Sequence, residues 1–301
     1  MRRIEIDLPF TCCGLRIDET QTLGLLSYYE LLDGATSTRC GGVALVNLSE
    51  TVSSGALQTT WEWKLNKGVY DAQFSILDKN ILLFIDSDGG INSFNRVTNE
   101  KNSTNIHSAI ADCFCQNSKF ICVGFNDGNV ALLSHTFELL SIIKIDEYEA
   151  YSCCFVDDSS DTVLIGGGSG PMYMLQGGIK RVVKRFDAAI CSITKIENLF
   201  YCGCYDDHFY AFELTERGKL RTVHSTAMDA AVWRVQKVED KLVCAACQCG
   251  TFIFCADTLE SLETHTPDRE NVLCYGSEQS VNSIYMVDFY NKKLDIFMPG
   301  E

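Results

Sequence analysis

The chain has 301 residues, of which 46% are hydrophobic and 22% are charged. This composition is typical of a globular protein, because a disordered chain has fewer apolar residues and a bundle of membrane helices has fewer charges. The formal net charge of −15 excludes a polyanion such as nucleic acid as a partner, since the two would repel each other.

The 16 cysteines are expected to act as small apolar side chains, because a chain of this length buries a core without disulfides. The first ten residues lack the apolar core of a secretion signal, since Glu5 and Asp7 interrupt it. No apolar run is long enough to span a membrane. We therefore expect a reduced, cytoplasmic protein with no membrane partner.

Short apolar runs, each ending in a polar or glycine turn, follow one another along the chain. Six of them are rich in Val, Ile, Leu, Phe, Tyr and Cys and occupy residues 80–86, 119–125, 161–166, 198–204, 241–247 and 282–288. Runs of this length and composition are typical of β-strands. The turns that close them recur about every forty residues, the spacing of four-stranded β-propeller blades, and lie at Gly89, Gly128, Gly170, Asp207, Gly250 and Asn291.

We assign these runs as the second strand, b, of blades whose strands a to d run from the channel outward. Strands a are expected at residues 69–75, 109–115, 150–155, 188–194, 231–235 and 272–277, and strands d for instance at 138–145 and 180–186. An earlier blade fits residues 11–65, with a longer excursion between strands b and c around residues 32–41. The last blade ends at residues 297–301 without a strand d, which residues 2–8 are expected to supply. The sequence thus predicts one all-β domain over residues 1–301, a seven-bladed, WD-repeat-like β-propeller closed by an N-terminal strand.

Neighbouring strands of a blade run in opposite directions, so every b–c turn is expected on the same face as every d–a connection. We call this the upper face. Strand a begins there and lines the central channel. Residues far apart in the sequence are therefore expected to meet at the mouth of the channel.

The second half of the chain contains four groups of motifs in consecutive blades. They are E-Y-E-A-Y (147–151) with I-G-G-G-S-G (165–170), G-C-Y-D-D-H-F (203–209), A-V-W-R (231–234) with L-V-C-A-A-C-Q-C-G-T-F (242–252), and Y-G (275–276) with V-D-F-Y-N-K-K-L-D-I-F (287–297). In sequence, order and spacing these segments resemble the diphthine methyltransferase family of WD-repeat propellers over about residues 145–297. The chain departs from the family pattern at Cys204, Gln279, Asn291, Asp295 and Phe297.

The resemblance implies a methylesterase of diphthamide biosynthesis. Such an enzyme hydrolyses the methyl ester of methylated diphthine, a modified histidine of translation elongation factor 2, and releases methanol. The diphthine-bearing loop of the factor is then the protein substrate, and we expect a monomer that uses no cofactor and no metal. The alternative is a non-catalytic WD-repeat scaffold that docks a basic protein loop.

Ester hydrolysis requires a nucleophile, a base that activates it and donors for the developing oxyanion. His208 is the candidate base, because it follows Asp206 and Asp207 in a b–c turn, where a carboxylate would hold the imidazole and raise its basicity. Alternatively, Glu149 or Asp207 activates a water directly. Structural roles also fit, since Asp206 occupies the position of a turn-stabilising aspartate of WD repeats and Glu149 lies in a d–a connection.

Aromatic residues near the blade tops suit the trimethylammonium group of diphthine, because aromatic faces attract quaternary ammonium ions. The residues expected to bind substrate are Tyr205, Trp233, Arg234, Tyr275 and Tyr290. Trp233 and Arg234 begin a strand a, so alternation directs one toward the channel and the other into the packing between blades. Arg234 either contacts the substrate carboxylate or ester carbonyl, or it satisfies backbone carbonyls beside a core Trp233.

Cys244, Cys247 and Cys249 form a C-x-x-C-x-C motif. In a strand, Cys247 and Cys249 share one face and Cys244 points to the other, and no histidine pair completes a tetrahedral metal site. We therefore expect core thiols here. The alternative is that Cys247 acts as a thiol nucleophile, which would require a nearby base.

Overall fold

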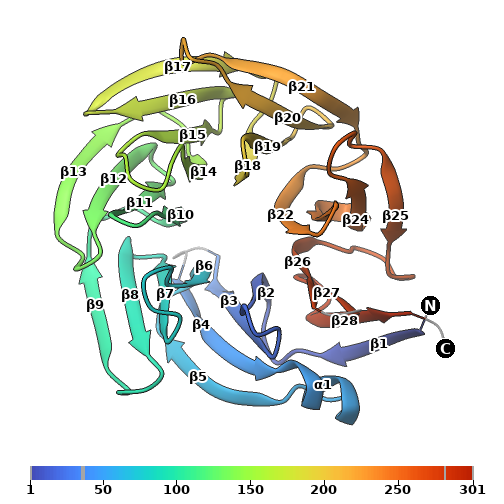
Figure 1. Ribbon diagram of the computed structural model, residues 1–301. Helices are drawn as coiled ribbons and strands as arrows, with labels where there is room; N and C mark the ends of the chain where they lie inside the picture. The colour runs from blue at the N-terminus through green and yellow to red at the C-terminus, as the bar shows by residue number, and fades with distance from the viewer. Residues whose placement is uncertain (1, 35–37, 281–282, 300–301) are drawn as a thin grey trace. The chain divides into compact units, whose positions relative to one another are not determined.

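The structure is a computed structural model that describes residues 2–34, 38–280 and 283–299. The described chain forms seven four-stranded antiparallel sheets, together with one α-helix and one 3-10 turn (Figure 1). Seven such sheets are the blades of a β-propeller. The predicted all-β, seven-bladed fold is confirmed.

In six of the sheets the strands follow the chain in order from strand a to strand d. The first three sheets comprise β2 (Cys12–Ile17), β3 (Leu23–Asp33), β4 (Thr38–Asn47) and β5 (Thr59–Leu65); β6 (Val69–Phe74), β7 (Ile81–Asp86), β8 (Gly90–Asn95) and β9 (Lys101–Asn105); and β10 (Ala111–Gln116), β11 (Phe120–Phe125), β12 (Asn129–Ser134) and β13 (Leu139–Lys144). The next three comprise β14 (Ala150–Phe155), β15 (Val163–Gly167), β16 (Pro171–Gln176) and β17 (Ile179–Arg185); β18 (Ile190–Ile196), β19 (Leu199–Cys204), β20 (His208–Leu214) and β21 (Leu220–Ala227); and β22 (Val232–Val238), β23 (Lys241–Ala246), β24 (Gly250–Cys255) and β25 (Ser261–His265).

The seventh sheet combines both ends of the chain. It contains β26 (Cys274–Ser280), β27 (Ser283–Asp288), β28 (Lys293–Met298) and β1 (Arg2–Asp7). β1 pairs antiparallel with β28, so that Ile4 lies opposite Ile296 and Ile6 opposite Leu294. Because alternate residues of β1 face the core, these pairs fix its register. The prediction that N-terminal residues supply the missing strand d is confirmed.

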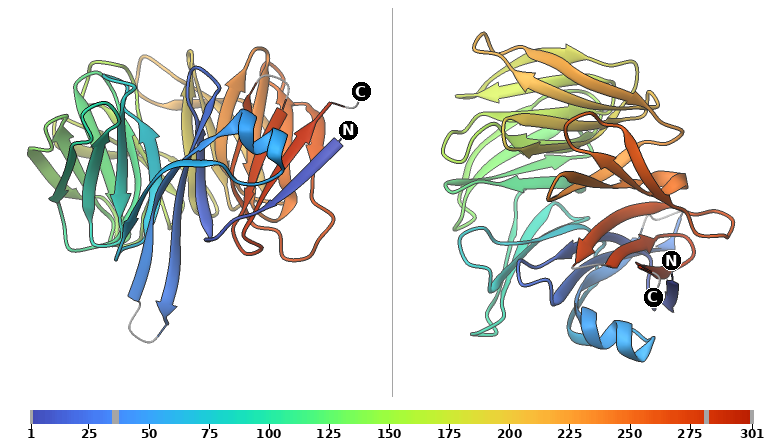
Figure 2. Two further views of the ribbon diagram at one scale, coloured as in Figure 1. Left: turned by 90° about the horizontal axis from the view of Figure 1, so that it is seen from below. Right: turned by 45° about the vertical axis from the view of Figure 1, so that its right-hand side comes forward.

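Parts of three predicted segments lie outside the described residues. They are residue 282 of the predicted strand 282–288, residues 300–301 at the predicted end of the last blade, and residues 35–37 of the predicted b–c excursion. The described part of that excursion is formed by the ends of two long strands, β3 with 11 residues and β4 with 10. This hairpin extends past the other strands of its sheet (Figure 2).

The sequence did not predict the helix α1 (Leu48–Ser54), which lies between β4 and β5. The side chain of Asn47 caps its first turn by accepting a hydrogen bond from the backbone N–H of Glu50. Gly55 ends it in the left-handed conformation, with φ of 66°. A helix of two turns is too short to show a helical period in the sequence, which explains why α1 was not predicted.

The predicted strand over residues 241–247 ends one residue early. β23 stops at Ala246, and the residues Cys247–Cys249 form a 3-10 turn between β23 and β24. The argument that Cys247 and Cys249 share one face of a strand is therefore wrong, because a turn has no such alternation. Cys244 and Cys247 are nevertheless buried, as expected of core thiols.

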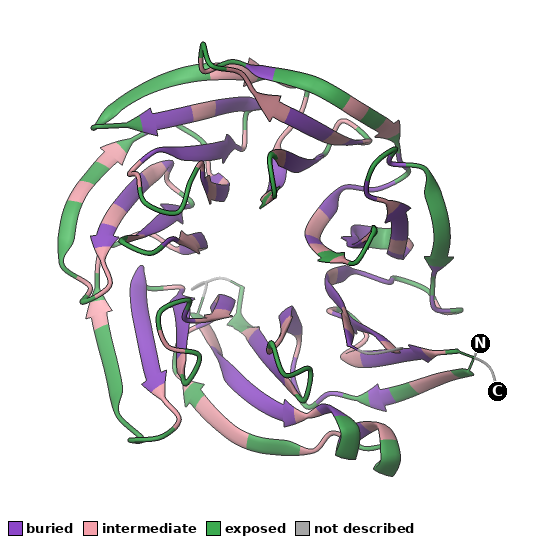
Figure 3. Ribbon diagram, in the orientation of Figure 1, coloured by how far each residue is buried: buried purple, intermediate pink, exposed green. Residues whose placement is uncertain are grey.

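Apolar side chains fill the space between consecutive sheets. One such cluster contains Leu83 and Ile85 of β7 together with Phe114, Val123 and Phe125 of the next sheet, all at most 3% exposed. Burying each of these side chains is worth about 1.5–3 kcal/mol. The outer strands β9, β13, β17 and β25 are mostly exposed, whereas the inner strands of each sheet are mostly buried (Figure 3).

Each b–c turn lies at the same end of its sheet as the connection that follows strand d. The backbone N–H of Ile106 donates to Gly89 O, that of Ile145 to Gly128 O, and that of Met228 to Asp207 O. In each pair the first residue follows strand d and the second lies in the b–c turn. We call this the upper end of each sheet.

The chain divides into two compact units, which we describe separately. The first unit contains residues 1–73 and 233–301, and the second contains residues 74–232. Within the described ranges, no helix is long and apolar enough to cross a membrane.

Candidate functional site

The turn between β19 and β20, in the second unit, carries His208 and Asp207. Asp207 has a φ of 61°, so the chain reverses there in the left-handed conformation. The carboxylate of Asp206 accepts a hydrogen bond from the Tyr210 hydroxyl at 2.8 Å. Together with burial, this bond raises the pKa of Tyr210 above its usual range. Asp206 therefore has the turn-stabilising role that the sequence allowed for it.

His208 lies in an arrangement suited to a general base. Its Nδ1 atom is 2.8 Å from the backbone oxygen of Asp206, so Nδ1–H donates to that carbonyl. The proton on Nδ1 leaves Nε2 as the basic nitrogen. The ring stacks on Tyr210 with centroids 5.7 Å apart, and the side chain is 44% exposed. The carboxylate nearest to the ring belongs to Asp206, 3.9 Å away, and not to Asp207.

Glu149 lies in the connection between β13 and β14, also in the second unit. Its backbone oxygen accepts a hydrogen bond from the N–H of Gly168 at 2.8 Å. Its carboxylate lies against Gly168. A Cβ atom added to this glycine would be only 2.9 Å from Oε2 of Glu149. Burial and then the negative charge of Glu149 raise the pKa of Tyr151. Among the described residues, no hydrogen bond or ion pair connects Glu149 with His208.

The first strands of five of the described sheets share a β-bulge at their upper ends. The pairing with strand b shifts by one residue between Cys12 and Gly14, between Ala111 and Cys113, and at the equivalent points of β14, β18 and β26. The residues inside these five bulges are Cys13, Asp112, Tyr151, Cys191 and Tyr275. A bulge redirects a side chain out of the regular alternation and is common beside binding sites.

An aromatic cluster forms in the first unit, and it contains three of the predicted substrate-binding residues. The ring of Trp233 meets Tyr275 edge-on at a centroid distance of 5.0 Å. Phe289 lies 5.5 Å from both Tyr275 and Tyr290. Tyr29 lies 5.1 Å from Phe289 and 4.6 Å from Tyr70. We use the name aromatic cluster for Tyr29, Tyr70, Trp233, Tyr275, Phe289 and Tyr290.

The members of the aromatic cluster differ in how far they reach solvent. Tyr290 is 65% exposed, whereas the other five side chains are partly buried. Burial raises the pKa of the Tyr29 hydroxyl above its usual range, so this ring stays uncharged at neutral pH. The sequence analysis missed Tyr29, Tyr70 and Phe289. Phe289 precedes the predicted Tyr290 in the same motif, so that motif could have identified it. Tyr29 and Tyr70 lie outside the family-like segments.

Arg234, predicted to contact the substrate, belongs to a network of charged side chains in the first unit. One of its terminal nitrogens lies 2.8 Å from the carboxylate of Asp71, which is 2% exposed. Arg16 lies 3.3 Å from the carboxylate of Glu278 and 4.0 Å from Asp71. Desolvation raises the pKa of Glu278, although the positive charge of Arg16 opposes this effect. The ion pair with Asp71 orients Arg234.

Tyr205, the remaining predicted substrate-binding residue, lies in the second unit. It begins the turn after β19, and its backbone N–H donates to Ala189 O at 2.9 Å. Its side chain is 44% exposed. The predicted site residues are therefore distributed over both units: Glu149, Tyr205, Asp207 and His208 in the second, and Trp233, Arg234, Tyr275 and Tyr290 in the first.

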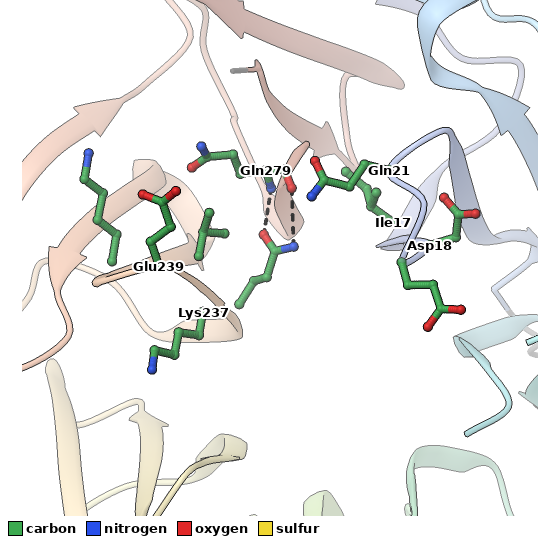
Figure 4. Close-up of a pocket in the computed structure, with 10 residues that line it drawn as sticks. Ile17, Asp18, Gln21, Lys237, Glu239 and Gln279 are labelled. Atoms are coloured by element: carbon green, nitrogen blue, oxygen red, sulfur yellow. Dashed lines mark hydrogen bonds between the residues drawn. The ribbon is translucent and has the colours of Figure 1, made fainter. Parts of the chain in front are cut away.

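A polar pocket of about 690 Å³ lies at the opposite end of the sheets in the first unit (Figure 4). The turn after β2 contributes Asp18 and Gln21, the end of β22 contributes Lys237, and the turn after β22 contributes Glu239. Gln279 forms two hydrogen bonds with Gln236 in its wall, at 2.7 and 3.4 Å. None of the predicted site residues lines this pocket.

Comparison with solved structures supports the fold over the whole chain. The chain is similar to a chain of the mitotic checkpoint complex, with a TM-score of 0.77, 13% identity, and coverage of 99% of this chain and 91% of that chain. It is also similar to the computationally designed Ika8 protein, with a TM-score of 0.67, 12% identity, and coverage of 98% and 99% respectively. At such low identity, the likeness shows the fold alone. No family model and no curated protein matches the sequence.

The sheets and these likenesses together define a seven-bladed β-propeller of the WD-repeat-like kind. In this class of protein, the specific activity depends on the side chains at the ends of the sheets and not on the fold.

Proposed function

We propose that this protein is a methylesterase that hydrolyses the methyl ester of methylated diphthine on translation elongation factor 2. The observation that carries the proposal is the aromatic cluster around Trp233, Tyr275 and Phe289. Contact between a quaternary ammonium group and one aromatic face is worth about 0.5–2 kcal/mol. Several rings gathered in one place therefore suit the trimethylammonium group of diphthine. The family-like motifs over residues 145–297 also support this assignment.

The proposed reaction uses His208 as the general base. Nε2 removes a proton from a water molecule, whose oxygen attacks the ester carbonyl and forms a tetrahedral intermediate. The intermediate then collapses, the bond to the methoxy oxygen breaks, and the imidazolium returns the proton to the departing methanol. The products are methanol and the free carboxylate of diphthine. The hydrogen bond from Nδ1–H to Asp206 O supports this assignment, since it presents Nε2 unprotonated.

Direct activation of the water by Glu149 or Asp207 is the competing mechanism. A carboxylate in this role would make the imidazole dispensable. The proposed enzyme uses no cofactor in the ester hydrolysis, acts as a monomer and works in the cytoplasm on the diphthine-bearing loop.

The test is incubation of the purified chain with elongation factor 2 that carries methylated diphthine. Catalysis releases one methanol per modified factor and lowers the mass of the factor by one CH₂ unit. The factor with unmethylated diphthine serves as the control and should lose no mass. Binding of the methylated factor without any release of methanol would contradict the methylesterase.

A non-catalytic scaffold that docks a basic protein loop is the second candidate. The net charge of −15 favours it, because an acidic surface attracts basic segments whether or not catalysis follows. A scaffold would bind methylated and demethylated factor alike and leave both unchanged. Equal affinity with no turnover would therefore select the scaffold over the enzyme.

A further inference from the structure

Three cysteine sulfurs meet between the third and fourth sheets, within the second unit. The Sγ atoms of Cys115 in β10, Cys122 in β11 and Cys153 in β14 all lie within 4.8 Å of one another. The Sγ atom of Cys113, also in β10, lies 3.7 Å from that of Cys153. All four residues are reduced thiols. We use the name thiol cluster for Cys113, Cys115, Cys122 and Cys153.

The strand pairing fixes the positions of these sulfurs. Cys115 lies directly opposite Cys122 in the antiparallel pair of β10 and β11, so both side chains project from the same face of the sheet. Cys113 precedes Cys115 by two residues and therefore shares that face. Cys153 projects from the first strand of the next sheet, against this face. Three strands from two sheets thus hold the cluster, with no ordering of a loop required.

The surroundings of the thiol cluster are apolar. Cys113, Cys122 and Cys153 belong to the core cluster that also contains Val130 and Phe155. A thiolate in an apolar environment is costly unless a cation compensates its charge.

We propose that the thiol cluster binds Zn²⁺, or another thiophilic ion with a filled d shell. Zn²⁺ in structural sites takes four ligands in a tetrahedron with Zn–S bonds of about 2.3 Å, which places the sulfurs about 3.8 Å apart. The separation of 3.7 Å between Cys113 and Cys153 matches this value, and the other sulfurs lie within 4.8 Å, so small side-chain rotations complete the site. Cys115 is the partly exposed member of the three and offers a route of entry.

Binding exchanges protons for metal–sulfur bonds without any transfer of electrons. Cys115, Cys122 and Cys153 each release a thiol proton to solvent and form one Zn–S bond. The complex then has a single negative charge, and Cys113 supplies the fourth position as a neutral thiol or, with release of its proton, as a thiolate. The ion would join β10 and β11 to β14 and so stabilise the contact between two blades. This role is separate from the proposed ester hydrolysis, because the cluster lies toward the end of β10 opposite the b–c turn.

The first experiment measures the zinc content of the chain. The protein is purified under reducing conditions, loaded with Zn²⁺, passed through a desalting column and analysed for bound zinc. We expect about one tightly bound zinc per chain, and at least a tenfold weaker affinity in the Cys122→Ala and Cys153→Ala variants. Cys244→Ala is the matched control, since Cys244 is also a fully buried strand cysteine but lies outside the cluster. It should bind zinc like the original chain.

The second experiment needs no variant and so avoids the question of whether the substitutions fold. X-ray absorption by the zinc-loaded original chain should show only sulfur neighbours, three or four of them at about 2.3 Å. Zinc should also raise the thermal midpoint of the original chain and of Cys244→Ala, because the ion binds the folded state. A spectrum dominated by nitrogen or oxygen neighbours would overturn the proposal. So would a reduced chain without stoichiometric zinc, or a Cys115–Cys122 disulfide in place of the metal.

Discussion

A single hydrogen bond decides which nitrogen of His208 is available as a base. Nδ1–H donates to Asp206 O, which leaves Nε2 as the basic nitrogen. A glutamine at this position has a similar shape but no basic nitrogen. We expect His208→Gln to lower the rate of methanol release by about 10²–10⁴-fold while binding of the factor changes little. The measurement is single-turnover demethylation at saturating enzyme.

The matched control for this variant is His224→Gln, which removes an imidazole from the outer strand β21 of the same sheet and should leave the rate unchanged. If His208→Gln turns over as fast as the original chain, a carboxylate must activate the water. Glu149→Gln and Asp207→Asn would then distinguish the two carboxylates of the competing mechanism.

Another histidine makes the stability of the protein depend on pH. His265 is 8% exposed and stacks on Phe297 at 5.2 Å, and burial lowers its pKa below the usual value of 6.5. Glu263, 3.4 Å away, only partly offsets this effect. As the pH falls through 6.5, the unfolded chain takes up the proton first, so this residue contributes less stability at lower pH.

We therefore expect the original chain to lose more stability than His265→Gln when the pH falls from about 7 to about 5. Urea denaturation of both proteins at a series of pH values measures the difference between their free energies of unfolding. This difference should change steadily below pH 6.5 and be constant above it. A difference that does not vary with pH would contradict the assignment.

At the scale of elements, Arg269 connects the strands that complete the seventh sheet. Its Nε lies 2.8 Å from Asp288, and its terminal nitrogens contact Asp295 and Glu5. The side chains of Asp288 and Asp295 are fully buried, so the guanidinium compensates two charges that have no access to water. Arg3 of β1 adds a second positive charge, 2.7 Å from Asp295.

We expect Arg269→Gln to lower the free energy of unfolding by about 3–5 kcal/mol, because it removes the cation beside the buried carboxylate of Asp288 and leaves that of Asp295 with Arg3 alone. The matched control is Arg221→Gln, which removes an exposed ion pair with Glu213 and should cost at most about 1 kcal/mol. Chemical denaturation measures both values. If both substitutions lowered the free energy of unfolding equally, the ion pairs of Arg269 would not contribute more to stability than an exposed pair does.

Alternation and turn spacing were sufficient to predict most of the strands of this fold. Apolar runs of the right length located the strands, and the lack of a strand d in the last blade predicted the pairing of β1 with β28. The same reasoning failed where the chain leaves the strand pattern. The helix α1 and the turn Cys247–Cys249 span only a few residues and depend on local capping and turn geometry. The bulge at Tyr275 is a further local departure from strand alternation that the residue pattern did not predict.

At the scale of the whole molecule, the sequence identified candidate site residues one at a time and not the groups in which they lie. His208, Trp233 and Tyr275 stood in recognisable motifs. Contacts such as that between Tyr29 and Phe289, or between Cys122 and Cys153, join different sheets and have no fixed spacing in the sequence. The sequence analysis considered Cys244, Cys247 and Cys249 because they are close together in the sequence. The cysteine sulfurs that lie close together in the structure are instead those of the thiol cluster.

The net charge of −15 and the aromatic cluster predict different effects on binding of the loop that carries the cationic trimethylammonium group. Charge accelerates association over a distance that salt shortens, from about 10 Å at 0.1 M to about 3 Å at 1 M. The rings act only in contact and therefore slow dissociation. Raising the salt should lower the association rate constant by about tenfold or more and change the dissociation rate constant little.

Tyr275→Leu should change the other rate constant. It should accelerate dissociation by several-fold at every salt concentration, because it removes one aromatic face from the cluster. Tyr148→Leu is the matched control, since Tyr148 is 58% exposed and lies outside the aromatic cluster. Stopped-flow or surface-based kinetics with the methylated factor measure both rate constants. Association that is independent of salt would contradict steering by charge. Equal dissociation from Tyr275→Leu and Tyr148→Leu would contradict recognition of the trimethylammonium group by the cluster.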